Sequence, residues 1–450
     1  MTGQISTSTD PSPAISMPSR RRLLSYGVGS VGTGIFSTVP GLLLLYYMTD
    51  TLAVPAGVAG LVVTLPKAWD AFFNPYVGAA SDREAVRTGR RTRLLLLGAA
   101  LLPLAFAAMF LSPATGSGAV AWITLAFVLA ASTYALFQVP YVALPTEMST
   151  DPAIRTRIMG WRIVSLTVGI LVAGGLAPAI VDAAGKGRAG YALMGVVVGA
   201  VLWVVLSVSA RGTRWVASRP GPEQLSLPAA FRAARGNRTF FALLTAFVIQ
   251  AAATAIMLAA APYVATYRLG HYGLTSVLFV CLVAPSAVAV PLWTRAARRF
   301  GRLRCLLVAT LGYAAGSAAL LPVGAAANVP GTLALCAVLG ICYAALQLLP
   351  LSLLPDTIVA DTGRTGHIQS GAFTGLWTAG ETAGLALGPG AYALGLAATG
   401  FASSTLEHPV AQTALARTGV LAGFSLVPAV LVLVSLPALF AYARRRKESH

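Results

Sequence analysis

Long apolar runs are the feature that most constrains how this chain can fold. An α-helix needs about 20 apolar residues to cross the hydrocarbon core of a bilayer, and runs of that length follow one another along most of the 450 residues. We therefore predict an all-α membrane protein in which each run spans the membrane as a helix. The twelve predicted spans lie at about 24–48, 58–80, 93–112, 119–144, 159–181, 190–210, 239–266, 274–294, 304–324, 331–354, 370–399 and 415–442.

The charged residues support the same fold class. Only 10% of the residues are charged, against roughly 25% in a soluble protein of ordinary composition, so most of the surface must face lipid. A net charge of +18 in a soluble domain would indicate nucleic-acid binding. Here the basic residues form short clusters between apolar runs, so we expect no nucleic-acid partner.

Cysteine and histidine give no sign of a metal centre or a catalytic site. Cys281, Cys305, Cys336 and Cys342 lie inside or at the edge of apolar runs and lack the spacing of metal ligands. No nucleophile is paired with any of the four histidines, which fall in loops or at the terminus: His271, His367, His408 and His450. We therefore expect no metal site and no enzyme activity, and no cofactor other than a coupling ion.

Basic residues also indicate the orientation. About 27 of the 32 Lys and Arg residues fall on one side of the predicted spans and about four on the other. Because cytoplasmic loops carry such an excess, we predict an inner-membrane protein with both termini in the cytoplasm. Arg20-Arg21-Arg22 is interpreted as the positive flank of a retained first span rather than as a twin-arginine export signal.

The two halves of the chain resemble each other at a shift of about 210 residues. Tyr134-Ala-Leu-Phe-Gln138 matches Tyr343-Ala-Ala-Leu-Gln347, and an acid follows each segment, Glu147 in one half and Asp356 in the other. Parallel six-helix repeats with a substrate site between them are the arrangement of the major facilitator superfamily. We expect a disordered segment at 1–19, six-helix bundles at 20–210 and 239–442, a polar linker at 211–238 and a tail at 443–450.

Few ionisable side chains fall inside the predicted spans, where they are costly and usually functional. Lys67, Asp70 and Asn74 share one face of the second span. They are interpreted as a coupling-ion site, or alternatively as a self-neutralising pair that only stabilises the fold. Glu381 has no basic residue within one helical turn, so it is a candidate proton carrier or else a structural partner of Arg162 or Lys67.

Polar side chains also occur at matching depths in both halves. Tyr134, Gln138, Tyr343 and Gln347 can form the hydrogen-bonding lining of a solute site. Equally, they can tie helices together, as polar side chains do in membranes. We place Arg162 and Trp377 with them in the candidate solute site.

Charged residues at the predicted cytoplasmic ends of the spans form a second group. Alternating access requires contacts that form in one state and break in another, and charged pairs at the inner mouth suit that task. The alternative is that the arginines only set the topology. The candidate gating residues are Asp82, Arg83, Arg90, Arg91, Glu147, Arg155, Asp356, Asp361 and Arg364.

Several of these motifs resemble one branch of the superfamily. Lys67-Ala-Trp69-Asp70-Ala-Phe-Phe-Asn74-Pro75-x-x-Gly78-x-x-Ser81-Asp82 is similar to the signature of the glycoside–pentoside–hexuronide:cation symporters. Pro140-Tyr141-x-x-Leu144-Pro145-x-Glu147 and Leu354-Pro355-Asp356 resemble further patterns of that family. The resemblance covers most of the chain and implies cation-coupled solute transport.

The departures from the family pattern bear on the ion and the substrate. By the resemblance, Asp70 matches the first of two aspartates in the sodium site and Asn74 replaces the second, which favours H⁺ over Na⁺. The sugar-binding aspartates fall at Gly34 and Gln138, while Glu381 stands in place of a lysine. These changes argue against a simple galactoside. Arg162 matches a binding-site arginine and favours a solute with an anionic group.

These observations predict a monomeric secondary transporter that moves a small solute by alternating access, in symport with a cation. The alternatives are a proton-driven exporter of a metabolite or drug, and a non-transporting membrane sensor with the same fold. The sequence does not identify the solute.

Overall fold

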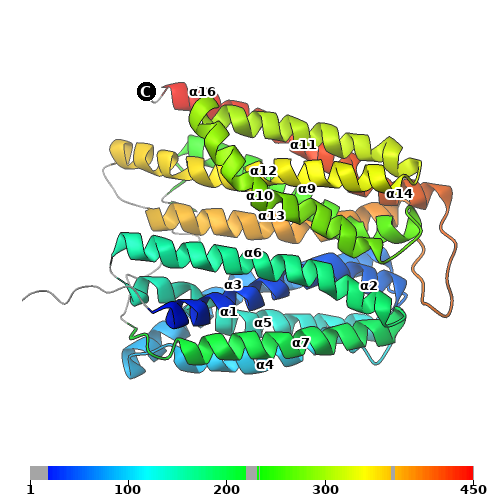
Figure 1. Cartoon of the computed structure of the whole chain (residues 1–450), viewed down its shortest axis with the longest axis horizontal. Helices are drawn as coiled ribbons and strands as arrows, with labels where there is room; N and C mark the ends of the chain where they lie inside the picture. The colour runs from blue at the N-terminus through cyan, green and yellow to red at the C-terminus, as the bar shows by residue number, and fades with distance from the viewer. Residues whose placement is uncertain (1–18, 150, 219–230, 233, 366–369, 449–450) are drawn as a thin grey trace, which may run out of the picture.

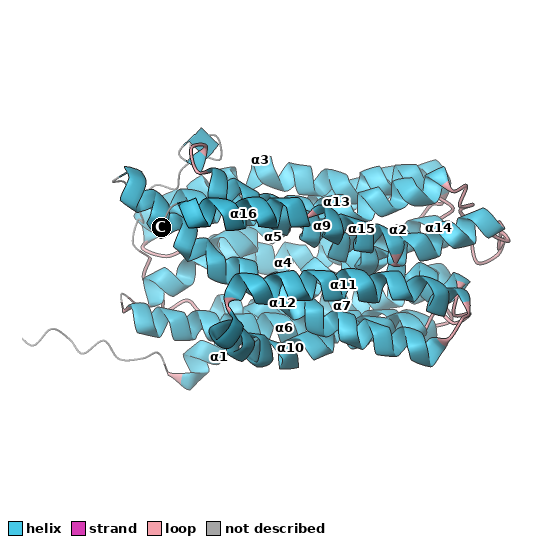
Figure 2. Cartoon of the chain, turned by 90° about the horizontal axis from the view of Figure 1, so that it is seen from above, coloured by secondary structure: helices cyan, strands magenta, loops and turns pink. Residues whose placement is uncertain are grey.

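The computed structural model describes residues 19–149, 151–218, 231–232, 234–365 and 370–448. In these ranges every regular element is helical, and most helices run along the long axis of the molecule (Figure 2). The start of α1 and the C-terminal end of the chain lie at the same end of the bundle (Figure 1). An even number of passes through the bundle accounts for this arrangement.

The first half contains six membrane-length helical segments. The first of them is continuous and consists of α1, a short π-helical turn η1 that begins at Pro40, and α2. Proline lacks the amide hydrogen that an α-helix requires, so a local change of helix type is expected there. The segments are α1 (Arg20–Val39), η1 (Pro40–Leu44) and α2 (Leu45–Asp50), then α3 (Ala56–Thr88), α4 (Thr92–Phe110), α5 (Gly116–Met148), α6 (Pro152–Ala183) and α7 (Gly187–Gly212).

The second half repeats this plan. Its last membrane pass is broken into three helices at Ser425 and Ser435, although the sequence predicts one span there. Each serine hydroxyl donates a hydrogen bond to a preceding carbonyl, of Leu421 and Val432 respectively, and such bonds bend helices. The helices are α9 (Arg238–Tyr267), α10 (Leu274–Phe300), α11 (Arg302–Ala325), α12 (Val329–Thr365), α13 (Ser370–Ala398), α14 (Ala414–Phe424), α15 (Leu426–Val434) and α16 (Leu436–Glu448).

Helix packing confirms the two related bundles. In the first half α1 packs on α6, α3 and α4 pack on α5, and α4 packs on α7; the second half repeats these contacts as α9 on α13, α10 and α11 on α12, and α11 on α15. The two bundles occupy separate halves of the molecule (Figure 1). They meet where α3 packs on α13 and α6 packs on α10. This is the major facilitator fold.

Eleven helices of the described chain are long and apolar enough to cross a membrane. The eleventh predicted span, α13, forms a 29-residue helix but is not among them. Glycine, threonine and Glu381 lower its mean hydropathy. The helix that carries the candidate coupling residue Glu381 is therefore not apolar enough to be counted among the eleven.

Glycines allow α1 and α6 to approach closely. A Cβ atom at Gly169 would lie 2.3 Å from the carbonyl oxygen of Val31, and one at Gly34 would lie 2.6 Å from that of Leu166. Both contacts involve backbone atoms, which cannot move aside as a side-chain end can. The close packing of these two helices therefore depends on both glycines.

We expect Gly169→Ala to lower the melting temperature in detergent, because overpacking costs about 1–3 kcal/mol. Gly160→Ala on the same helix is the matched control, because a Cβ at that position meets nothing within 4 Å. There the better helix propensity of alanine should leave the melting temperature unchanged or slightly higher. Equal melting temperatures for the two variants would contradict this account of the α1–α6 contact.

Candidate functional site

Three predicted site residues from separate helices of the first half lie within electrostatic reach of one another. The charges of Asp70 on α3 and Arg162 on α6 both act on the hydroxyl of Tyr134 on α5. The Tyr134 ring stacks on Phe36 of α1, with ring centroids 4.5 Å apart. The structure thus brings an acid, a base and a phenol together in the interior of this bundle.

Four of the predicted coupling and solute-site residues have a buried polar atom without a hydrogen-bond partner among the described residues. Leaving such an atom unpaired costs about 1–3 kcal/mol, so each case requires an explanation, such as a water molecule or a ligand. Three lie in the first half and one in the second. The atoms are Asp70 Oδ1, Gln138 Oε1, Arg162 Nε and Trp377 Nε1.

The second half contributes a matching polar group. Gln347 donates a hydrogen bond from Nε2 to the hydroxyl of Tyr343 at 3.1 Å, and the charge of Glu381 acts on the same hydroxyl. Trp377, one helical turn before Glu381, stacks on Phe247 with centroids 4.5 Å apart. The Tyr343–Gln347 bond lies within α12 and joins no two helices, and Gln138 keeps its carbonyl oxygen unpaired.

The contact between α3 and α13 places the two candidate coupling acids at the same level. Gly57 packs on Ala397, Gly60 on Ala393 and Thr64 on Gly390. Continuing this antiparallel register puts Asp70 level with residues 383–384, one helical turn from Glu381. The two acids therefore lie at one depth on neighbouring helices of opposite halves.

The other residues of the predicted sites have different surroundings. Lys67 and Asp70 form no ion pair among the described side chains, since their atoms are more than 4 Å apart, although the Lys67 charge acts on the carboxyl group. Asn74 is exposed. Gly34 lies against the α6 backbone. Lys67 and Asp70 thus form no close ion pair, and both interpretations, a coupling site and a self-neutralising pair, stay predictions.

Sequence reasoning missed Tyr26 of α1 as a site residue. Its ring stacks on Tyr141 with centroids 4.6 Å apart, and its buried hydroxyl has no partner in the described part of the chain. The charge of Arg162 acts on both phenols. Its partner Tyr141 lies in the Pro140–Glu147 segment that resembles the symporter family, and that was the available signal.

Arg91 organises the arginine-rich end of the bundle, which we define by the α3–α4 turn (88–92) and the α10–α11 turn at Gly301. Its side chain is only 6% exposed and pairs with Asp82 at 2.6 Å and Glu147 at 2.8 Å. Nη1 also donates to Ser81 Oγ at 2.7 Å. Burial lowers the pKa of Arg91, but the hydrogen bonds and charges of Glu147 and Asp82 outweigh it and raise the pKa, so the group stays protonated.

The linker begins in contact with the same cluster. Ser218 donates from Oγ to Glu147 Oε2 at 2.7 Å, and its backbone amide donates to the Gly89 carbonyl at 2.9 Å. Arg22 stacks over the ring of Trp215, 4.4 Å from its centroid. The start of the linker is therefore fixed to the first half.

The second half has a counterpart of this cluster. Arg302 pairs with Asp356 at 3.1 Å and donates to the Ser352 carbonyl. The Arg91–Glu147 pair joins residues of the first half, and the Arg302–Asp356 pair joins residues of the second half. In this conformation the two pairs therefore stabilise the individual bundles and do not link one bundle to the other. Of the other candidate gating residues, Arg83 donates to Ala79 in its own helix, Arg90 is exposed, and Arg155 Nε has no partner among the described residues. The side chains of Asp361 and Arg364 lie outside the described residues.

Contacts between the halves close the opposite end of the bundle, which we call the closed end. The Tyr267 hydroxyl of α9 donates to Oδ1 of Asp50, the last residue of α2. Thr49 and Tyr263 share a hydrogen bond of 2.7 Å, and Tyr191 and Tyr272 share one of 3.0 Å. Asp50 lies just beyond the first predicted span and was not among the predicted site residues, so this cluster was missed.

We expect Tyr267→Phe to loosen the closed end, because leaving a buried hydrogen-bonding group without its partner costs about 1–3 kcal/mol. Amide hydrogen exchange over residues 46–56 should then be about ten times faster or more. Tyr313→Phe is the control, since this buried tyrosine donates to Met257 within the second half. Unchanged exchange in Tyr267→Phe, or equal acceleration in both variants, would show that the Asp50 contact does not hold this end closed.

Two six-helix repeats with unpaired polar side chains in their interior, closed at one end, define a secondary transporter of the major facilitator superfamily. The chain belongs to the MFS/sugar transport protein family, whose sequence model matches residues 25–443. This match confirms the resemblance to the glycoside–pentoside–hexuronide:cation symporters.

Relatives agree with this assignment, and a solved structure agrees with the fold. A glucuronide carrier protein homologue of Escherichia coli is 24% identical over 94% of this chain and 92% of its own. An Escherichia coli protein provisionally named a 2,3-dihydroxypropane-1-sulfonate exporter is 25% identical over 69% of this chain and 68% of its own. A bacterial homologue of the human lysosomal transporter Spinster, inward-facing and unoccupied, has a TM-score of 0.72 at 15% identity, covering 96% of this chain and 99% of its own.

Some alignments cover only part of the relative. Three symporters of Escherichia coli, Bacillus subtilis and Synechocystis are matched over 37%, 66% and 37% of their own lengths. The family assignment therefore rests on the match to residues 25–443.

Proposed function

We propose that this protein is a cation-coupled symporter for a small solute with an anionic group, and that the arginine-rich end faces the cytoplasm. The observation that carries the proposal is the set of unpaired buried atoms on Asp70, Gln138, Arg162 and Trp377. A polar solute bound between the halves would supply their missing partners. In this proposal Tyr134, Tyr343 and Gln347 complete the lining.

The coupling ion in this proposal is a proton, and Asp70 and Glu381 are the groups that carry it. A proton needs one carboxylate, whereas Na⁺ requires several oxygen ligands, and Asn74 offers no charge. The two acids are level on α3 and α13, which belong to opposite halves, so rocking of the halves would change the surroundings of both at once.

The anionic character of the solute follows from Arg162. A guanidinium with an unpaired Nε presents a donor suited to a carboxylate or sulfonate. Two relatives carry names that refer to such anions, a glucuronide and 2,3-dihydroxypropane-1-sulfonate. The positively charged arginine therefore selects the class of solute, and the surrounding amides and phenols contact its hydroxyl groups.

Uptake into proteoliposomes tests the proposal. Glucuronate and 2,3-dihydroxypropane-1-sulfonate would be compared with their uncharged analogues glucose and glycerol, with the outside acidic and choline as the only other cation. We expect an acid-driven uptake of at least one anion and none for its neutral analogue. Equal uptake of charged and neutral analogues, without a response to pH, would contradict the proposal.

Proton-driven export is the second candidate, because one relative is provisionally named an exporter. The same solute-binding residues and the same two acids would serve import or export of the solute. Import predicts that solute and protons enter the vesicle together, whereas proton-driven export predicts that an outward proton movement accompanies solute entry. The sign of the pH change in the vesicle lumen therefore separates the two.

A further inference from the structure

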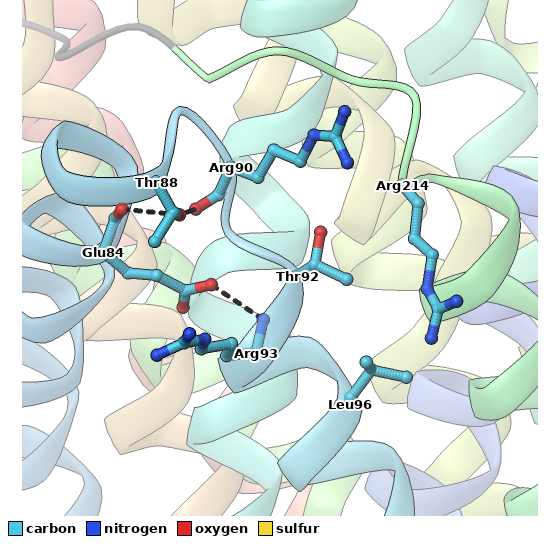
Figure 3. Close-up of a pocket in the computed structure, with 7 residues that line it drawn as sticks. All are labelled: Glu84, Thr88, Arg90, Thr92, Arg93, Leu96 and Arg214. Carbon is cyan, nitrogen blue, oxygen red and sulfur yellow. Dashed lines mark hydrogen bonds between the residues drawn. The ribbon is translucent and has the colours of Figure 1, made fainter.

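A cavity of about 460 Å³ lies at the arginine-rich end, apart from the candidate solute site. It is formed by the end of α3, the start of α4 and the residues that follow α7. The lining residues are Glu84, Thr88, Arg90, Thr92, Arg93, Leu96 and Arg214 (Figure 3).

The charge of this cavity is positive. It contains three guanidinium groups and a single carboxylate, and that carboxylate is already engaged: Glu84 accepts the amide hydrogens of Arg93 at 2.7 Å and Leu94 at 3.2 Å. In the described part of the chain, Arg90, Arg93 and Arg214 form no ion pair. Two positive charges therefore remain without a counter-ion.

The geometry suits an oxyanion with several oxygens. The side chains of Arg90 and Arg214 flank Thr92, whose hydroxyl points into the space between them (Figure 3). Thr92 is also the first residue of α4, where the helix dipole favours negative charge. Arginine forks, a hydroxyl and a helix N-terminus are the groups by which proteins hold phosphate.

An apolar path leads from the cavity toward the lipid. Leu97, Leu101 and Leu104 follow the cavity on one face of α4, and all three are at least 43% exposed. This helix lies at the edge of the bundle beside α7 (Figure 1). A molecule with a phosphate group in the cavity could thus lay acyl chains along these leucines.

We propose that this cavity binds the phosphate of an anionic phospholipid headgroup. Arg90 precedes the Arg91 cluster and Arg214 precedes Ser218, so the bound headgroup would join the α3–α4 turn to the start of the linker. The lipid would then act on the same contacts that fix the linker to the first half. This role is separate from solute binding and does not depend on the identity of the solute.

Binding to the purified full-length protein tests the proposal. Short-chain phosphatidylglycerol, phosphatidylcholine and inorganic phosphate would be titrated against the wild type and Arg90→Gln/Arg214→Gln. We expect saturable binding of phosphatidylglycerol but not phosphatidylcholine, weakened about tenfold or more in the double variant. Arg298→Gln/Arg299→Gln, which removes two exposed arginines from the end of α10, should bind as the wild type does.

The remaining outcomes are also decisive. Inorganic phosphate that binds as tightly as the lipid, with the same loss in the double variant, would keep the site but identify its ligand as a soluble phosphate. Unchanged lipid binding in Arg90→Gln/Arg214→Gln, or an equal loss in the α10 control, would overturn the proposal. Arg214→Gln alone provides the same comparison if the double variant does not fold.

Discussion

Arg162→Gln is expected to weaken the binding of an anionic solute about a hundredfold. Removing one partner of a desolvated charge pair costs about 2–5 kcal/mol, and each 1.4 kcal/mol changes Kd tenfold. Glutamine keeps a hydrogen-bond donor but is shorter than arginine, so the change removes the charge together with the guanidinium fork. The measurement is a Kd for glucuronate or 2,3-dihydroxypropane-1-sulfonate, whichever is transported.

Arg162→Lys and a neutral analogue serve as controls. Lysine retains the charge but loses the fork geometry of the guanidinium, so its Kd should fall between those of the wild type and the glutamine variant. The weak binding of glucose or glycerol should not change with the charge at this position. An Arg162→Gln variant that binds the anion as the wild type does would remove Arg162 from the solute site.

Arg91→Gln is expected to produce the largest loss of stability among single arginine variants. The change leaves Glu147, whose side chain is 6% exposed, without its charged partner, and breaking a buried ion pair costs about 3–5 kcal/mol. The pair with Asp82 adds little, because that carboxylate is 60% exposed. A lower melting temperature in detergent would show the effect.

The internal repeat supplies the matched control. Arg302 and Asp356 occupy corresponding positions in the second half, but their side chains are 39% and 30% exposed. Exposed ion pairs contribute about 0–1 kcal/mol, so Arg302→Gln should destabilise the protein much less. Equal melting temperatures for the two variants would contradict the role assigned to burial.

The sequence predicted the helices well because apolar length is a direct requirement of the bilayer. Their ends were less predictable, since hydropathy reports only the part in hydrocarbon. For example, α3 was expected to end near residue 80 and continues to Thr88, and α6 was expected to begin near 159 and begins at Pro152. These additional helical turns lie at the membrane surface, where polar residues are favourable. The additional turns of α3 carry Asp82 and Glu84.

The site was predictable only in part, for a different reason. Asp70 was found because ionisable residues are rare in spans, Gln138 through the internal repeat and Arg162 through the family resemblance. The structure leaves a buried atom of each without a partner in the described part of the chain. The Asp50–Tyr267 contact joins residues 217 positions apart, and nothing local in either segment signals it. Arg302 was not among the predicted site residues, and its pair with Asp356 depends on the packing of α11 on α12.

The central claim is that Asp70 and Glu381 couple a proton to a solute bound between two repeats. The most direct test records the pH inside proteoliposomes when the transported anion is added without an imposed gradient. We predict acidification of the lumen with the wild type, and none with Asp70→Asn or Glu381→Gln even where the anion still binds. Acidification that persists in both variants would contradict the claim.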